Sequence, residues 1–247
     1  MLDWLYTAVS WVLEVWHSLL STVLPPAGGV TWALSVVLLV VTVRVLLFPL
    51  AARQVAGQRA MQELHPEIDR LRTRHGDDTA GFSKAVLDLQ RERGVNPLAG
   101  CLPVLPQIPV FLGLLHVLRR IAPGAAGLYG WSTELTRQAA EATLLGAPVA
   151  SSSTAGDARL VAVLLLVATC ATTFWTQRQM QRRSGPVEGQ AATVQKVLLY
   201  GTPVGLFASG LFFPILVLLY WITTNLWTLG QQSYLLRRLP PPQHGAG

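Results

Sequence analysis

The chain has 247 residues, of which 51% are hydrophobic and 13% are charged. The charged share is about half that of an average soluble protein, and the mean hydropathy is +0.41. This composition excludes an ordinary soluble domain and predicts an integral membrane protein. The net charge of +6 is therefore interpreted first by its position along the chain, because Lys and Arg in loops set the orientation of membrane spans.

Residues 1–29 predict an extracytoplasmic amphipathic helix and loop, with the helix lying on the membrane surface. The apolar residues fall on one helical face: Leu5, Val9, Val12, Leu13, Trp16, Leu19, Leu20 and Val23. Trp4 and Trp11 are typical of a membrane interface, and Glu14 interrupts any spanning character. The helix should end at Pro25. A short membrane span is the alternative interpretation.

Residues 30–50 form an apolar run of 21 residues, long enough for a helix to cross a bilayer. Arg44 is the only charged residue in the run. A lone cation at that depth costs at least about 2.5–3.5 kcal/mol on insertion scales. Either the Arg44 side chain extends to the interface near Leu50, or the charge is used within the membrane. The residues alone leave both interpretations open.

Residues 51–97 turn abruptly polar and predict a cytoplasmic helical hairpin. Basic and acidic residues are nearly balanced there, and two apolar stripes flank a turn signal at residues 75–78. Pro66 should bend or restart the first arm.

The remaining apolar runs predict four more spans, at residues 98–118, 160–177, 192–208 and 211–231. They leave an extracytoplasmic loop at 119–159, a cytoplasmic loop at 178–191 and a cytoplasmic tail at 232–247. Residues 150–156 are expected to form flexible loop, and Gly205 to Gly210 to make the turn between the last two spans. The predicted fold is an all-α polytopic membrane protein. It has five transmembrane helices, a hairpin between the first and second, and an N-terminal interfacial helix.

Lys and Arg residues predict the orientation of the spans. Residues 51–96, residues 178–196 and the tail carry 14 of them, against four in residues 119–159 and none in residues 1–29. The excess of cytoplasmic positive charge places the N-terminus outside and the C-terminus in the cytoplasm.

The stretch from Glu92 to Phe111 resembles the most recognisable signature of the YidC family of membrane protein insertases. Residues 42–50 look like the family's first core span with its groove arginine. Residues 213–225, with Phe213-Pro214, Tyr220-Trp221 and Asn225, are similar to its last span. The resemblance covers residues 30–236.

Two positions depart from the family pattern. Leu216 stands where the family often has Gly, and Pro106 where it often has Gln or Ile. The chain also has neither the added N-terminal span nor the large periplasmic domain of many diderm members. It therefore resembles the short Gram-positive form, and its low Lys and high Arg and Ala content favours an actinobacterial source.

The resemblance implies an insertase and membrane chaperone of the bacterial plasma membrane, which is not an enzyme and needs no cofactor or metal. It implies nascent membrane proteins and the lipid bilayer as partners, together with the ribosome, a targeting factor and the Sec translocon. No sequence-specific nucleic acid binding is expected.

The family also implies a hydrophilic groove, open to cytoplasm and lipid, in which Arg44 holds water and attracts acidic residues of a substrate. No Asp or Glu lies in any predicted span, so the sequence offers Arg44 no internal partner. The polar residues predicted to line the groove are Thr42, Gln107, Thr172, Thr173, Gln177, Thr223, Thr224, Asn225 and Gln231. Gln107 and Thr224 are the strongest of these. Ordinary helix–helix packing is the alternative role for each.

A transporter or channel with an intramembrane anion site at Arg44 is the alternative function. The predicted spans carry no Asp or Glu for proton coupling, and no inverted repeat is visible. The spans also contain no Ser–His pair, paired Asp or His-Glu-x-x-His motif, which argues against an intramembrane enzyme.

Overall fold

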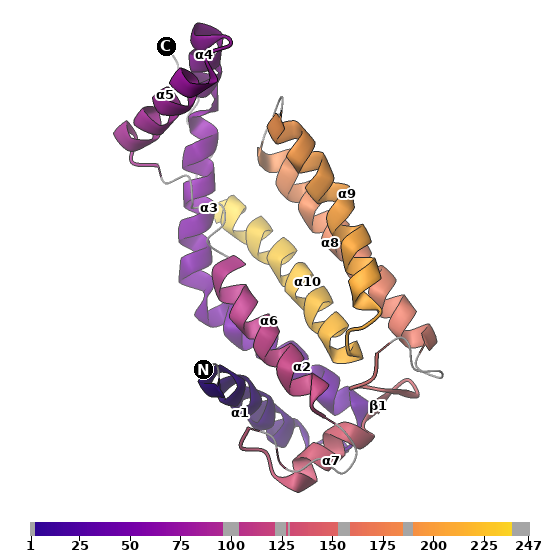
Figure 1. Cartoon of the computed structure of the whole chain (residues 1–247). Coiled ribbons are helices and arrows are strands. Elements are labelled where there is room, and N and C mark those ends of the chain that lie inside the picture. The colour runs from indigo at the N-terminus through magenta and orange to yellow at the C-terminus, as the bar shows by residue number, and fades with distance from the viewer. Residues whose placement is uncertain are drawn as a thin grey trace. The chain divides into compact units, whose positions relative to one another are not determined.

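The computed structural model describes residues 3–95, 104–121, 127, 129–152, 159–184 and 190–238. These residues form ten helices and one two-stranded hairpin (Figure 1), which confirms the predicted helical class. The chain divides into two units, described separately below: Met1–Leu46 with Gln107–Leu229, and Leu47–Pro106 with Gly230–Gly247.

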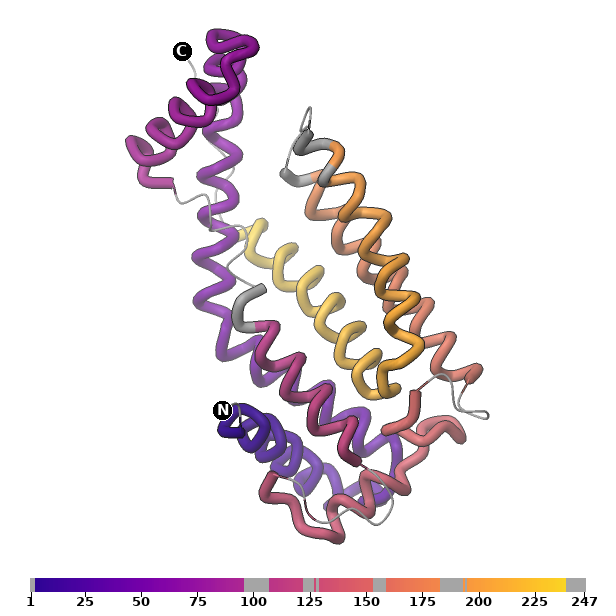
Figure 2. The backbone as a smooth tube through the Cα atoms, viewed as in Figure 1, coloured from indigo at the N-terminus to yellow at the C-terminus, as the bar shows by residue number. Residues whose placement is uncertain are grey.

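Figure 2 traces the backbone through these elements. The helices of the first unit are α1 (Asp3–Leu20), α2 (Gly29–Leu46), α6 (Val104–Arg119), α7 (Thr133–Glu141), α8 (Arg159–Ser184), α9 (Gln190–Gly210) and α10 (Ile215–Arg238). Helices α6 and α10 each extend into the second unit at one end. The strands are β1 (Thr143–Leu144) and β2 (Ala147–Pro148), and the second unit holds α3 (Phe48–Glu63), α4 (His65–His75) and α5 (Thr79–Glu92).

Helix α1 packs against α2 with a face that matches the predicted one only in part. Leu5, Val9 and Leu13 are buried as expected, whereas Leu19 is exposed and His17 is buried. A histidine is not part of an apolar pattern, so its burial needs polar partners that the pattern does not reveal.

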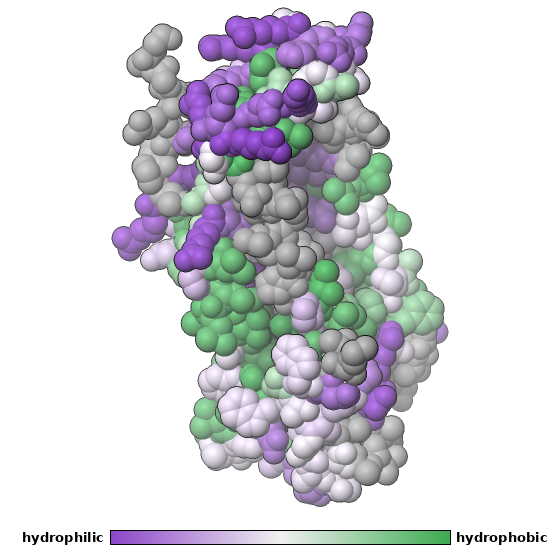
Figure 3. All heavy atoms as spheres, turned by 60° about the vertical axis from the view of Figure 1, so that its left-hand side comes forward, coloured by the Kyte–Doolittle hydropathy of each residue, from purple (hydrophilic) through white to green (hydrophobic). Residues whose placement is uncertain are grey.

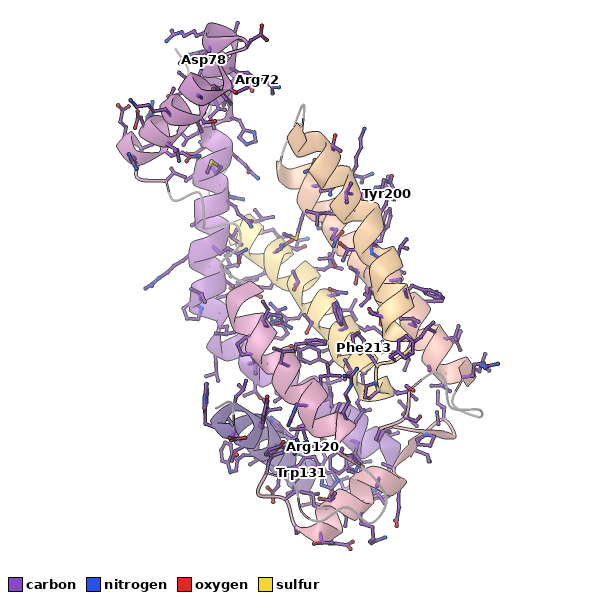
Figure 4. All side chains as sticks on the ribbon, viewed as in Figure 1. Arg72, Asp78, Arg120, Trp131, Tyr200 and Phe213 are labelled. Carbon is purple, nitrogen blue, oxygen red and sulfur yellow. The ribbon has the colours of Figure 1, made fainter. Side chains whose placement is uncertain are left out.

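Those partners lie in the turn between α1 and α2. The Nε2 of His17 donates to the Pro26 carbonyl at 2.8 Å, and the imidazole lies 4.3 Å from the Trp32 ring. Trp32 is fully buried, and its ring lies 5.4 Å from the ring of Trp131. Trp131 is labelled in Figure 4. Trp131 in turn donates its indole N–H to the Ser10 carbonyl at 3.0 Å. These contacts join α1, α2 and the chain before α7 into one core.

The predicted loop at residues 119–159 contains regular structure that the sequence analysis missed. Ser132 caps α7 by accepting from the Leu135 N–H at 3.1 Å. The hairpin β1–β2 turns through Leu145 and Gly146, both with positive φ, as a two-residue hairpin turn of type I′ requires. Helix α7 has nine residues and each strand has two, which is shorter than the windows of about 11–18 residues over which periodicity is identified. Of the expected flexible stretch, residues 153–156 lie outside the described residues.

Residues 143–152, here called the outer segment, contact the beginnings of both α2 and α10. Thr143 forms an isolated parallel β-bridge with Gly28, the residue directly before α2. The Ile215 N–H donates to the Ser151 carbonyl at 3.1 Å, and the Leu216 N–H donates to the Val149 carbonyl at 3.4 Å. The first N–H groups of a helix have no partner within it. The outer segment therefore caps α10 with its own backbone.

Two helix boundaries differ from the predicted ones. Helix α2 ends at Leu46 rather than at residue 50, since Pro49 has no N–H to continue the helix and instead lies in the first turn of α3. Helix α9 continues through Gly205 to Gly210, so the expected turn at those glycines is wrong and the turn lies at residues 211–214. Glycine can lie within a helix, so Gly205 did not mark the end of α9, as the sequence had suggested.

The second unit holds α3, α4 and α5 in the segment for which the sequence predicted a helical hairpin. Pro66 lies in the first turn of α4, directly after the break at Leu64, as the sequence predicted. Helices α4 and α5 pack against each other, and Arg93 pairs with Glu67 at 2.6 Å. Asp78 caps α5 by accepting from the Gly81 N–H at 2.9 Å. Hydrophilic side chains dominate these helices on the face shown in Figure 3.

Two of the described helices are long and apolar enough to cross a bilayer on their own, Gly29–Leu46 and Arg159–Arg182. The described part of α6 adds a shorter apolar helix, Gln107–Arg119. The count of five spans stays a prediction.

We predict that Gly29→Ala destabilises the first unit. A Cβ at this position would overlap the backbone carbonyl of Thr143, which cannot move without breaking the outer segment. Overpacking of this kind costs about 1–3 kcal/mol of stability, so the midpoint temperature of thermal unfolding, measured in detergent, should fall. The matched control is Gly205→Ala, where nothing lies within 4 Å of the added Cβ. Equal midpoints for the two variants would contradict the close contact.

Candidate functional site

Arg44 lies in the last turn of α2 and is partly buried. The sequence placed it six residues from the inner end of its span, whereas the helix ends two residues beyond it, at Leu46. The last carbonyls of a helix carry partial negative charge, which favours a cation there. No Asp or Glu among the described residues forms an ion pair with Arg44. The helix end therefore offsets part of the cost of the charge without neutralising it.

Tyr220 of α10 brings three helices together. Its side chain is 3% exposed, and its hydroxyl accepts a hydrogen bond from the Gln107 amide of α6. Arg44 of α2 lies within electrostatic range of the same hydroxyl. Thr224 is also buried. It follows Tyr220 by one turn of α10, so the two residues share a face of that helix. Gln107 and Thr224, the strongest predicted groove residues, thus lie beside Tyr220.

A second polar contact joins α10 to α8. The Asn225 amide donates to the Thr173 hydroxyl at 2.8 Å and to the Thr172 hydroxyl at 3.3 Å. The Thr169 hydroxyl, one turn earlier on α8, approaches the Leu218 carbonyl at 3.4 Å. Asn225 and Thr173 are both buried. These bonds fit the packing role that polar residues often have between membrane helices.

The other predicted residues lie apart from these two groups. Thr42 accepts from the Trp16 indole at 3.0 Å, which places it on the side of α2 that faces α1. Thr223 donates to its own helix at the Leu219 carbonyl. Gln177 keeps a buried amide oxygen without a hydrogen bond among the described residues, and Gln231 belongs to the second unit.

Tyr220 was quoted for the resemblance but missed as a site residue. Its ring is apolar enough to fit the run from 211 to 221, so it did not stand out as Arg44 and Gln107 did. A buried tyrosine hydroxyl normally finds a hydrogen-bond partner. The presence of a tyrosine within an apolar run is therefore the feature of the sequence that could have identified Tyr220 as a site residue.

A family model described as "60Kd inner membrane protein" matches residues 23–242. The chain belongs to this family. The chain is also similar to curated proteins named "Membrane protein insertase YidC", which confirms the resemblance seen in the sequence.

Two of these relatives come from actinobacteria, the source that the composition favoured. The protein of Streptomyces avermitilis is 38% identical over 249 residues, which cover 95% of this chain and 58% of that protein. The protein of Mycobacterium tuberculosis is 37% identical over 264 residues, covering 95% of this chain and 72% of the relative. The family is one of membrane insertases rather than enzymes, which confirms the expectation that the chain is not an enzyme.

We predict an energetic coupling between Asn225 and Thr173. Asn225→Leu and Thr173→Val each remove one partner of the 2.8 Å hydrogen bond with little change in shape. A double-mutant cycle should give a coupling of about 0.6–1.7 kcal/mol, between the mean and the maximum measured for bonds between membrane helices. Unfolding of the detergent-solubilised protein provides the measurement.

The matched control replaces Thr173→Val with Thr223→Val, because the one bond of the Thr223 hydroxyl among the described residues is to its own helix backbone. Asn225→Leu and Thr223→Val should be additive. A cycle with Thr173 that is also additive would mean that the bond contributes nothing to stability.

Proposed function

We propose that this protein is a membrane protein insertase and chaperone whose substrates are nascent membrane proteins. Family membership and the names of the relatives support this function. The single structural observation that carries it is the group of polar side chains from α2, α6 and α10 around Tyr220. That group includes a cation, Arg44, with no acidic partner among the described residues.

Insertion requires no covalent step, only a lower cost for moving polar chain through the bilayer. An unpaired backbone group in hydrocarbon costs several kcal/mol. A hydrophilic groove at Arg44, Gln107 and Thr224 would hold water and hydrogen-bond partners along that route. Arg44 lacks an internal counter-charge, so it would attract acidic residues at the translocated end of a substrate.

The closed outer side of this groove is part of the proposal. The outer segment binds the first residues of α10 through backbone hydrogen bonds and contacts the chain just before α2. Trp32 and Trp131 fill the core beside it. These contacts support a groove that is sealed at this end and opens toward cytoplasm and lipid.

The proposed topology has five spans, formed by α2, α6, α8, α9 and α10, in the bacterial plasma membrane. The N-terminus lies outside, with α1 at the outer interface, and the C-terminus lies in the cytoplasm. The hairpin of α3, α4 and α5 would then be cytoplasmic, where it could meet a ribosome, a targeting factor or the Sec translocon. Its α4–α5 cleft of about 600 Å³ carries both charges, including Arg70 and Asp88, and supports such a role.

We predict that Arg44→Ala impairs insertion whereas Arg44→Lys largely retains it, because a charge-based role survives a change of cation. A hydrogen bond to a charged group contributes about 1.5–3 kcal/mol, so the Ala variant should lose roughly tenfold or more in insertion. The measurement is insertion of a single-spanning substrate with an acidic translocated end into proteoliposomes. Arg53→Ala, at an exposed arginine of α3, is the control and should remain active.

Equal insertion activity of Arg44→Ala and Arg44→Lys would show that insertion does not depend on the charge at position 44. Arg44 would then be a residue whose side chain only extends to the membrane interface. The same vesicles test the alternative function. Protein-dependent anion flux without a substrate chain, lost in Arg44→Ala, would favour a channel or transporter over an insertase.

A further inference from the structure

Helix α8 keeps one apolar face exposed along most of its length. Its exposed residues Leu160, Leu164, Val167, Ala171 and Trp175 recur every three or four positions, which places them on one side of the helix. The opposite side packs against α9 and α10 (Figure 1). An exposed apolar stripe on a helix of a membrane protein family is suited to lipid chains.

The stripe ends in a cleft of about 330 Å³ lined by Trp175, Arg178, Gln179 and Arg182. Trp175 is 63% exposed, and both arginines are exposed as well. Arg178 and Arg182 lie one turn apart and continue the direction of the stripe. In the described part of the chain neither arginine has a carboxylate partner, so the cleft presents two uncompensated positive charges.

The spacing along α8 matches the layers of a bilayer. Fifteen residues separate Leu160 from Trp175, about 22 Å at 1.5 Å per residue, and Arg182 lies about 33 Å from Leu160. A hydrocarbon core is about 30 Å thick, and tryptophan concentrates at its edges. The stripe therefore lies within the hydrocarbon, and Arg182 lies at its edge, near the level of lipid phosphates. Trp175 and Arg178 lie about 8 Å and about 3 Å short of that edge and reach the interface through their long side chains.

We propose that the Trp175–Arg182 cleft binds the phosphate of an anionic phospholipid whose acyl chains lie along the α8 stripe. Guanidinium groups bind phosphate oxygens in pairs, and the Gln179 amide offers a further donor. The Trp175 ring covers the glycerol region. The site depends on α8 being a membrane helix and is independent of any insertase activity.

The test is native mass spectrometry of the full chain in detergent, titrated with phosphatidylglycerol or phosphatidylcholine. The protein should bind the first phosphatidylglycerol more tightly than phosphatidylcholine. Arg178→Gln combined with Arg182→Gln should weaken that first binding on the order of tenfold, since each basic residue near an anionic surface contributes measurably. The control is Arg70→Gln with Arg74→Gln, a pair at the same spacing on α4, which should leave the affinity within about twofold of the unmodified protein.

Three results would overturn the proposal: an unchanged affinity in the Arg178/Arg182 variant, an equal loss in the Arg70/Arg74 variant, or no preference for the anionic lipid. Excess inorganic phosphate separates lipid from free anion. Displacement of the lipid by millimolar phosphate would mean that the cleft takes phosphate alone, without the stripe. If the Gln variant loses helix content, Arg178→Lys with Arg182→Lys replaces it, and its preference for phosphatidylglycerol must then persist.

Discussion

The backbone hydrogen bonds between the outer segment and the start of α10 determine where the polar residues of the first unit lie. Ile215 and Leu216 donate to carbonyls of residues 149–151, and unpaired N–H groups in an apolar setting cost several kcal/mol. This requirement fixes the position at which α10 begins. Once the start is fixed, the helical repeat places Tyr220 toward Gln107 and Asn225 toward Thr173. The two polar contacts of α10 therefore depend on the chain that caps it.

Arg44 illustrates how a membrane protein keeps a charge without an acidic partner. A cation in the middle of a continuous span faces only saturated backbone groups, whereas Arg44 lies in the last turn before the break at Leu47. The carbonyls of that turn contribute about 0.3–1 kcal/mol of favourable interaction. Pro49, which causes the break, is thus part of what makes Arg44 tolerable. The charge remains available because this compensation is partial.

The sequence predicted the polar residues of the site better than the regular structure around them. Arg44, Gln107 and Asn225 were identifiable because a polar side chain contrasts with an apolar run. Tyr220 was not, since its ring is apolar and only its hydroxyl joins the contact. Helix α7 and the β1–β2 hairpin were missed because they are short, with nine residues in the helix and two in each strand, and periodicity is identified over windows of about 11–18 residues. The bond from Trp16 to Thr42 depends on tertiary packing that no local pattern encodes, and the place of Thr42 in a groove stays a prediction.

The position of the outer segment in the chain has a consequence for assembly during synthesis. Residues 143–152 are made more than one hundred residues after the start of α2, which they contact through Gly28. The beginning of α2 is therefore made before the outer segment that it contacts, whereas α10 is made after the outer segment whose carbonyls accept from its first N–H groups. Chains are made from the N-terminus at about 5–20 residues per second, so this interval lasts several seconds or more. During it, α1 and α2 can pair with each other alone, and the contacts of Tyr220 and Asn225 form only after α10 has been made.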